Sequence, residues 1–232
     1  RPPRSTLDRS SAASDVYKRQ LQYVGGDSSV KDSHDPIIIV KNSLGYKTDA
    51  DEEAAIREDT INNADMCCDK IHIVYGDFDQ KDTEQPYKRY KITYFAMPSP
   101  NAGDTHYGIY KSKESWIQRI GDEGGSWTAD DTVCAECYVE QKVRDHVVDM
   151  EFVPLNKAGL KMFPLPSPGT NAAARENLYK IKAIDLRLTF RSKNEFFRFT
   201  STKKPRWLKG LGDRHKAFLD KYLRDSVVVT IY

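Results

Sequence analysis

The chain has 232 residues, of which 39% are hydrophobic and 30% charged, a composition typical of a globular domain long enough to bury a core. Its 36 Lys and Arg nearly balance 34 Asp and Glu, so the net charge of +2 gives no overall reason to expect nucleic acid or an anionic membrane as a partner. The longest apolar run, at residues 37–40, has the length of a strand and is far shorter than the ~18 residues of a transmembrane helix.

The first twenty residues differ from the rest of the chain. Residues 1–20 are rich in Arg and Ser, and their stretch SAASDVYKRQ resembles translated adapter sequence from assembled sequencing reads. We therefore expect a non-native leader, with a disordered native tail as the alternative. Residues 21–232 are then expected to form a single β-rich globular domain.

The first half of that domain contains one predicted helix and several predicted strands. The run IIIV between breakers predicts a short strand, and residues 49–60, with an acidic first turn, predict a short helix. Apolar residues then alternate with polar ones in KIHIVYG and YKITYF, which predicts an antiparallel hairpin. Two further short strands are expected around residues 106–120, followed by a Gly-rich loop at 121–131.

The second half continues the alternation. Residues 132–153 predict either one strand or a pair joined near Asp145 and His146, with Val147 and Asp149 on one face, and residues 154–177 predict a long loop. Residues 179–191 predict a strand with one apolar core face and one solvent-facing polar face. Residues 213–225 have helical spacing, and SVVVTIY predicts a closing strand. The expected fold is mainly β (α+β), an antiparallel sheet with one or two short helices.

Four cysteines form two close pairs, Cys67-Cys68 and Cys134-x-x-Cys137. A disulfide, either between the pairs or within CAEC, would fit an oxidising compartment. Free structural thiols and a zinc site remain open, although a vicinal pair matches zinc spacing poorly. The sequence does not decide the connectivity.

Three other groups of residues are candidates for binding or chemistry. The loop after KIHIVYG carries four carboxylates that could bind calcium or simply be solvated: Asp77, Asp79, Asp82 and Glu84. A basic stretch around one Trp could contact an anionic polymer or be a solvated loop: Lys203, Lys204, Arg206, Trp207 and Lys209. His146 beside Asp145 and Asp149 could be part of a catalytic group, but no nucleophile or metalloprotease motif accompanies it, so we expect no enzyme and no cofactor.

Several segments resemble the type IV minor pilins of the PilW type and the related J-type pseudopilins of type II secretion. ADMCCDKIHIVYGDF followed by YKRYKITYF resembles the family's hairpin, and HYGIYKS resembles its next strand. VRDHVVDMEFVPLNKAG, LYKIKAIDLRLTFRS and YLRDSVVVTIY are similar to later family segments, in the same order. The matches span residues 64–232 with gaps, and the family's terminal Arg-Asn is missing from the last segment.

The resemblance implies a pilin-like head domain in a non-enzymatic fibre subunit that primes assembly or lies at the tip. Its partners would be other minor pilins or pseudopilins, contacted through strand edges and loops. It also implies a bacterial cell-envelope location, with an anchoring helix upstream of Leu21 in the inner membrane and the head in the periplasm or on an extracellular pilus. The alternatives are a phage or virion structural β domain, and a surface module that binds polysaccharide or nucleic acid.

Overall fold

The computed structural model describes residues 34–41, 67–78, 87–101, 106–118, 125–166, 172–196, 206–211 and 214–232. The described chain is mainly β. Its strands are β1 (Ile37–Val40), β2 (Lys70–Phe78), β3 (Tyr87–Pro98), β4 (Tyr107–Gln118), β5 (Gly125–Thr128), β6 (Tyr138–Leu155), β7 (Ala183–Arg191), β8 (Arg206–Lys209), β9 (His215–Phe218) and β10 (Arg224–Ile231), and its helix is α4 (Ala172–Tyr179). None of the described helices is long and apolar enough to cross a membrane.

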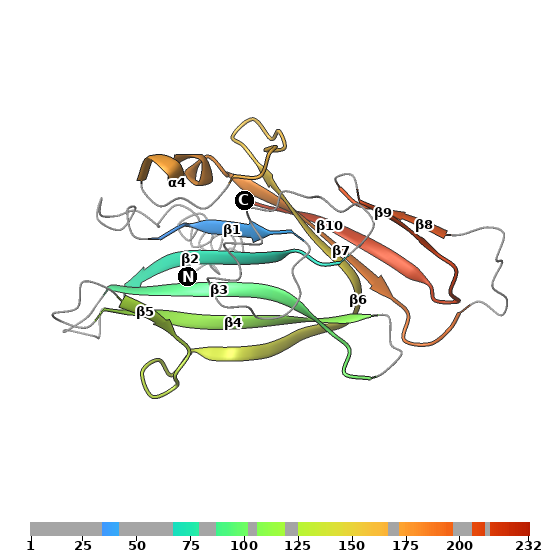
Figure 1. Cartoon of the computed structure of the whole chain (residues 1–232), viewed down its shortest axis with the longest axis horizontal. Helices are drawn as coiled ribbons and strands as arrows, with labels where there is room; N and C mark the ends of the chain where they lie inside the picture. The colour runs from blue at the N-terminus through green and yellow to red at the C-terminus, as the bar shows by residue number, and fades with distance from the viewer. Residues whose placement is uncertain are drawn as a thin grey trace, which may run out of the picture.

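Eight strands form one curled antiparallel sheet in the order β1-β2-β3-β4-β6-β7-β10, with β5 paired to β4 (Figure 1). Strands β8 and β9 form a separate hairpin. The predicted mainly β, antiparallel fold is confirmed. So is the predicted hairpin, because β2 pairs with β3 and places Ile73 opposite Ile92.

Strand β6 connects the two halves of the sheet. Its first half pairs with β4 and its second half pairs with β7. The register on β7 shifts between Val147 and Asp149, and His146 has a φ of 58°. One extra residue in a strand reverses the alternation of its side chains. Val147 therefore lies in the core with Met150, and the predicted shared face of Val147 and Asp149 is wrong.

One face of the sheet carries the main apolar core. Its buried residues come from five strands, β1, β2, β3, β4 and β6, together with the Cys67-Cys68 pair and Ile184 of β7. Cys67 and Cys68 form a vicinal disulfide in this core, with Cys67 at a φ of 131°. Burial of these side chains from water is the dominant force holding the curled sheet together.

The opposite face is polar and yet buried. Arg187, Thr189 and Arg191 of β7 are 6%, 0% and 7% exposed, which corrects the prediction that this face meets solvent. Hydrogen bonds make the burial tolerable. Arg187 Nη2 donates to Ser226 Oγ at 3.1 Å, and Thr189 Oγ1 lies 2.9 Å from the same oxygen. Ser226 is on β10, directly opposite Thr189.

A buried ionic cluster of Asp69, Asp149 and Arg214 lies beside the second half of β6, the part that does not pair with β4. The Asp69 backbone N–H donates to Met150 O at 2.7 Å, and an Asp69 carboxylate oxygen accepts the Phe152 N–H at 2.9 Å. Asp69 thus satisfies the edge of β6 as a neighbouring strand would. Arg214 donates to Asp69 and also to Asp149, at 3.0 Å, and both carboxylates are 0% exposed.

The Arg214 cluster reaches a second carboxylate of β6. The Leu211 N–H donates to Glu151 Oε2 at 2.6 Å, so the chain just after β8 is held on the polar face of the sheet. Desolvation raises the pKa of Asp149 to about 6, although Arg214 opposes the shift. The cluster therefore stabilises the packing of these segments, and the size of this stabilisation depends on the protonation of Asp149.

Other boundaries differ from the predictions. The helix expected over 213–225 is wrong, because β9 and the start of β10 occupy this segment. The Arg224 guanidinium stacks on the Phe218 ring at 3.7 Å, so pairing and packing override the helical spacing. Residues 107–118 form one strand rather than two, and β5 replaces part of the Gly-rich loop by pairing Trp127 with Trp116.

Residues 132–153 are resolved in favour of one strand, since β6 runs on through Asp145 and His146. The loop predicted at 154–177 begins after Leu155 and gives way to α4 at Ala172. The helix expected at 49–60 lies outside the described residues.

Candidate functional site

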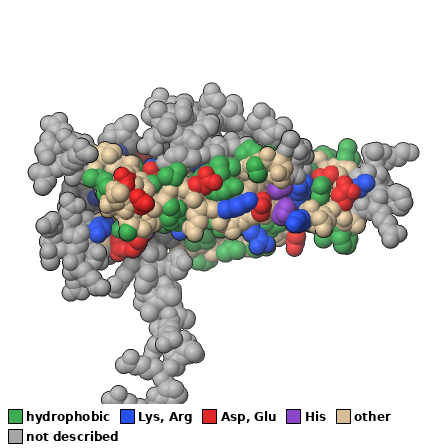
Figure 2. All heavy atoms as spheres, turned by 90° about the horizontal axis from the view of Figure 1, so that it is seen from below, with side chains coloured by type: hydrophobic (Ala, Val, Ile, Leu, Met, Phe, Trp, Pro, Cys, Tyr) green, Lys and Arg blue, Asp and Glu red, His purple; other side chains and the backbone are tan. Residues whose placement is uncertain are grey.

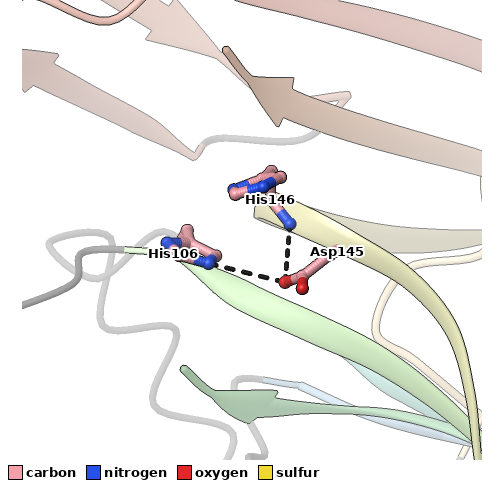
Figure 3. Close-up of side chains that lie close together, drawn as sticks. All are labelled: His106, Asp145 and His146. Carbon is pink, nitrogen blue, oxygen red and sulfur yellow. Dashed lines mark hydrogen bonds and ion pairs between the residues drawn. The ribbon is translucent and has the colours of Figure 1, made fainter. Parts of the chain in front are cut away.

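Three side chains meet at the irregular part of β6 around Asp145 and His146, which we call the β6 bend (Figure 3). His106 lies just before β4, whereas Asp145 and His146 are consecutive on β6. His106 Nε2 lies 3.4 Å from Asp145 Oδ1, and the same carboxylate oxygen accepts the His146 backbone N–H at 2.9 Å. The two imidazole rings are 4.5 Å apart between centroids. The bulge turns His146 out of the regular alternation and places its ring beside His106.

Arg191 sets the protonation of His106. Its Nη2 lies 2.6 Å from His106 Nδ1, and a guanidinium can only donate a hydrogen bond. His106 Nδ1 is therefore the acceptor, and the imidazole proton is on Nε2, facing Asp145. The chain thus runs from Arg191 through a neutral His106 to the Asp145 carboxylate.

Lys142 anchors the same carboxylate from the solvent side. Its Nζ lies 2.6 Å from Asp145 Oδ2. The hydrogen bond from Lys142 lowers the pKa of Asp145, and the reciprocal bond raises the pKa of Lys142. Asp145 is 42% exposed, so this ion pair contributes little to stability. Its main effect is to hold the carboxylate negative beside His106.

An open pocket of about 540 Å³ adjoins the cluster. Its walls come from the first part of β6 and from the end of β7: Lys142, Val143, Arg144, Asp145, His146, Phe190 and Arg191. Figure 2 shows histidine side chains next to basic and acidic ones on this face of the molecule. Three of the lining residues are basic and one is acidic, so the pocket carries an excess of positive charge.

The cluster offers a metal ion three donor atoms within 4.8 Å of one another, from His106, Asp145 and His146. Two imidazoles and a carboxylate are a common donor set for zinc. A metal on His106 Nε2 would need that nitrogen unprotonated, whereas the bond from Arg191 places the proton there. The positive charges of Arg191 and Lys142 also oppose a cation. The donor set therefore does not fit a metal ion in this arrangement.

The predicted catalytic fragment is only partly assembled. Asp145 and His146 lie together, but Asp149 belongs to the separate ionic cluster, where it binds Arg214 at 3.0 Å. Sequence reasoning missed His106 and Arg191. They are distant in sequence from each other and from His146, and no local motif marks them. Only the pairing of β6 with both β4 and β7 brings them together.

All four cysteines are oxidised, as two disulfides within the pairs: Cys67–Cys68 and Cys134–Cys137. The link between the pairs does not occur, and no thiolate remains for zinc. Of the calcium candidates, Asp77 is exposed near the end of β2, and Asp79, Asp82 and Glu84 lie outside the described residues.

The basic stretch is divided between two environments. Lys203 and Lys204 lie outside the described residues. Arg206 pairs with Asp220 at 3.5 Å, whereas the alternation of β8 places Trp207 and Lys209 on its exposed side. The Trp207 ring is 61% exposed and lies 5.8 Å from the His215 ring.

One more histidine is held in an aromatic cluster. His34 packs against Trp116 and Trp127, with ring centroids 4.3 and 5.0 Å away. Burial first, and then nearby basic side chains, lower its pKa to about 4. His34 is therefore neutral at physiological pH and acts as part of the core.

Comparisons of the chain with protein-family models, with curated proteins and with solved structures found no match.

Proposed function

We propose that the chain is a non-enzymatic structural subunit of a type IV pilus or of a type II secretion pseudopilus, acting in assembly priming or at the fibre tip. One observation carries the proposal. The segments that resemble the minor pilins form β2, β3, β4, β6, β7 and β10, and these are neighbours, in chain order, in one antiparallel sheet. An antiparallel β-sheet head domain is what the resemblance implies.

The last strand of the sheet supports a role in subunit contacts. No described strand pairs with the outer edge of β10. Its exposed apolar residues are Val227, Val228, Val229 and Ile231, each 40–51% exposed. A free edge with apolar side chains favours the addition of a strand from a neighbouring chain. In a fibre, that neighbour would be another minor pilin or pseudopilin.

The gene sequence upstream of Leu21 tests this proposal. We expect a short leader ending in Gly, followed by a Phe-led apolar segment of ~20 residues, the length that spans a bilayer. Neighbouring genes for other pilins would agree with it. A start codon close to Leu21 without such a segment, beside portal or tail genes, would replace the proposal with the virion alternative.

The outer face of the β8–β9 hairpin favours a second candidate function, binding of single-stranded nucleic acid. An exposed Trp207 beside Lys209 offers a stacking surface with a cation next to it. Changing Trp207 to Ala should then weaken binding of a single-stranded oligonucleotide at low salt by roughly 5- to 100-fold. Equal binding by Trp207→Ala and the unchanged protein would rule this function out.

A further inference from the structure

We propose that the pocket beside the β6 bend binds the oxyanion group, a carboxylate or a phosphate, of a small organic ligand. Its basic residues are Lys142, Arg144 and Arg191, against the single carboxylate of Asp145. These four side chains, three positive and one negative, give a net charge of +2 on the walls. An anion is the ligand that such a pocket attracts. This site does not depend on the proposed fibre function.

The two guanidinium groups of the pocket, from Arg144 and Arg191, each lie beside an aromatic ring. The Arg144 Cζ lies 5.4 Å from the centre of the Phe190 ring, and the Arg191 Cζ lies 4.1 Å from that of Tyr222. These contacts hold each guanidinium beside an aromatic ring, and a guanidinium presents its donors in a planar fork that matches an oxyanion. Arg144 is exposed and makes no hydrogen bond or ion pair to any residue that the structure describes.

His146 adds an independent observation. Its Nδ1 is shielded from solvent and has no hydrogen-bond partner among the described residues, and a buried polar atom left unmatched is destabilising. Its backbone is held at a φ of 58°, a left-handed conformation that is uncommon outside glycine. Such conformations cluster at ligand sites. An Nδ1–H of His146 would donate to the bound oxyanion.

The size and the apolar wall of the pocket indicate an organic ligand rather than a bare ion. A volume of about 540 Å³ falls within the range of small-molecule sites. Phe190 lines the pocket beside the cations, so an apolar body attached to the anion would bury surface against its ring. A ligand with both parts is therefore expected to bind better than its anion alone.

Calorimetric titrations at low ionic strength test the proposal with four probes: inorganic phosphate, phenyl phosphate, acetate and benzoate. Phenyl phosphate should bind several-fold more tightly than phosphate, or benzoate several-fold more tightly than acetate. NMR shifts of the His146 ring should accompany binding. Arg144→Gln and Lys142→Gln, both at exposed positions, should each weaken binding roughly tenfold, because each removes a charge-assisted hydrogen bond. Lys157→Gln, in the exposed turn after β6, makes the same charge change away from the pocket and should bind normally.

Three outcomes would overturn the proposal. The first is no binding of any probe at about 10 mM. The second is equal weakening by Lys157→Gln, which would indicate attraction by overall charge alone. The third is a response of His106 and His146 to zinc ions but to none of the anions, which would make the cluster a metal site. Carboxylate and phosphate sources are separated by whether benzoate or phenyl phosphate binds more tightly.

Discussion

Replacement of Arg214 by Met is expected to destabilise the protein strongly above pH 6 and much less at pH 4.5. Arg214 is 6% exposed and donates to Asp69 and Asp149, both 0% exposed. Met preserves much of the side-chain volume but removes the cation that faces Asp149, whereas Asp69 keeps Lys41 at 2.6 Å. Breaking a buried ion pair in this way costs about 3–5 kcal/mol. At low pH the Asp149 carboxylate takes up a proton, and the loss becomes smaller.

The pH dependence follows from the pKa of Asp149, which burial raises from 3.8 to about 6. A raised carboxyl pKa means that the folded state binds more protons than the unfolded state. The associated stability is present below about pH 4 and is lost as pH rises through about 6. A shift of about two units corresponds to roughly 3 kcal/mol. Asp149→Asn removes this titration, so its stability relative to the unchanged protein should rise by about that amount between pH 4 and pH 7.5.

Urea unfolding followed by tryptophan fluorescence at pH 4.5, 6 and 8 measures these differences. Differences between each variant and the unchanged protein cancel the titration of all other groups. The reasoning would be refuted if Arg214→Met lost the same free energy at pH 4.5 and pH 8, or less than about 1 kcal/mol at pH 8. An Asp149→Asn profile parallel to that of the unchanged protein would also contradict it.

Three further outcomes are expected. The His34 ring should titrate near pH 4 when followed by NMR. The unfolded state then binds more protons than the folded state between about pH 4 and 6.5, so the stability contributed by His34 falls as the pH drops through this range. A titration midpoint above about pH 6 would contradict the burial of His34. Removing the Cys134–Cys137 link by double Ser substitution should lower the unfolding free energy by about 2 kcal/mol, from the entropy of closing a four-residue loop, and an unchanged urea midpoint would refute this. Gly210→Ala should cost about 1–3 kcal/mol in the same assay, because the added Cβ would lie 2.5 Å from Glu151 Oε2; a neutral effect would show that this contact relaxes freely.

The sheet strands could be predicted where the signal is local. In β2 and β3 apolar and polar residues alternate, and the run SVVVTIY has high β propensity, so each strand is visible within about ten residues. The helix predicted over 213–225 is wrong. Phe218 and Tyr222 have helical spacing, but Phe218 lies in β9 and pairs with Arg206 of β8. Local spacing does not contain that pairing.

The polar face and the candidate site could not be predicted for a different reason. Arg191 looks like a solvent-facing residue of an alternating strand, yet it lies buried against His106, 85 positions away. Asp69 and Arg214 are 145 positions apart. A charged residue can be predicted to be buried only when its partner is known, and no sequence periodicity links residues so far apart. His146 was singled out in the sequence, but the bulge that turns it toward His106 has no sequence signal of its own.

The N-terminal sequence of the mature protein, isolated from the membranes or surface fibres of the cells that make it, tests the fibre-subunit account most directly. The account predicts a mature chain that begins with Phe, carries Glu near its start and continues through an apolar helix into Leu21. A mature protein that begins near Leu21 and is recovered in virions, or away from envelope and fibres, would contradict it.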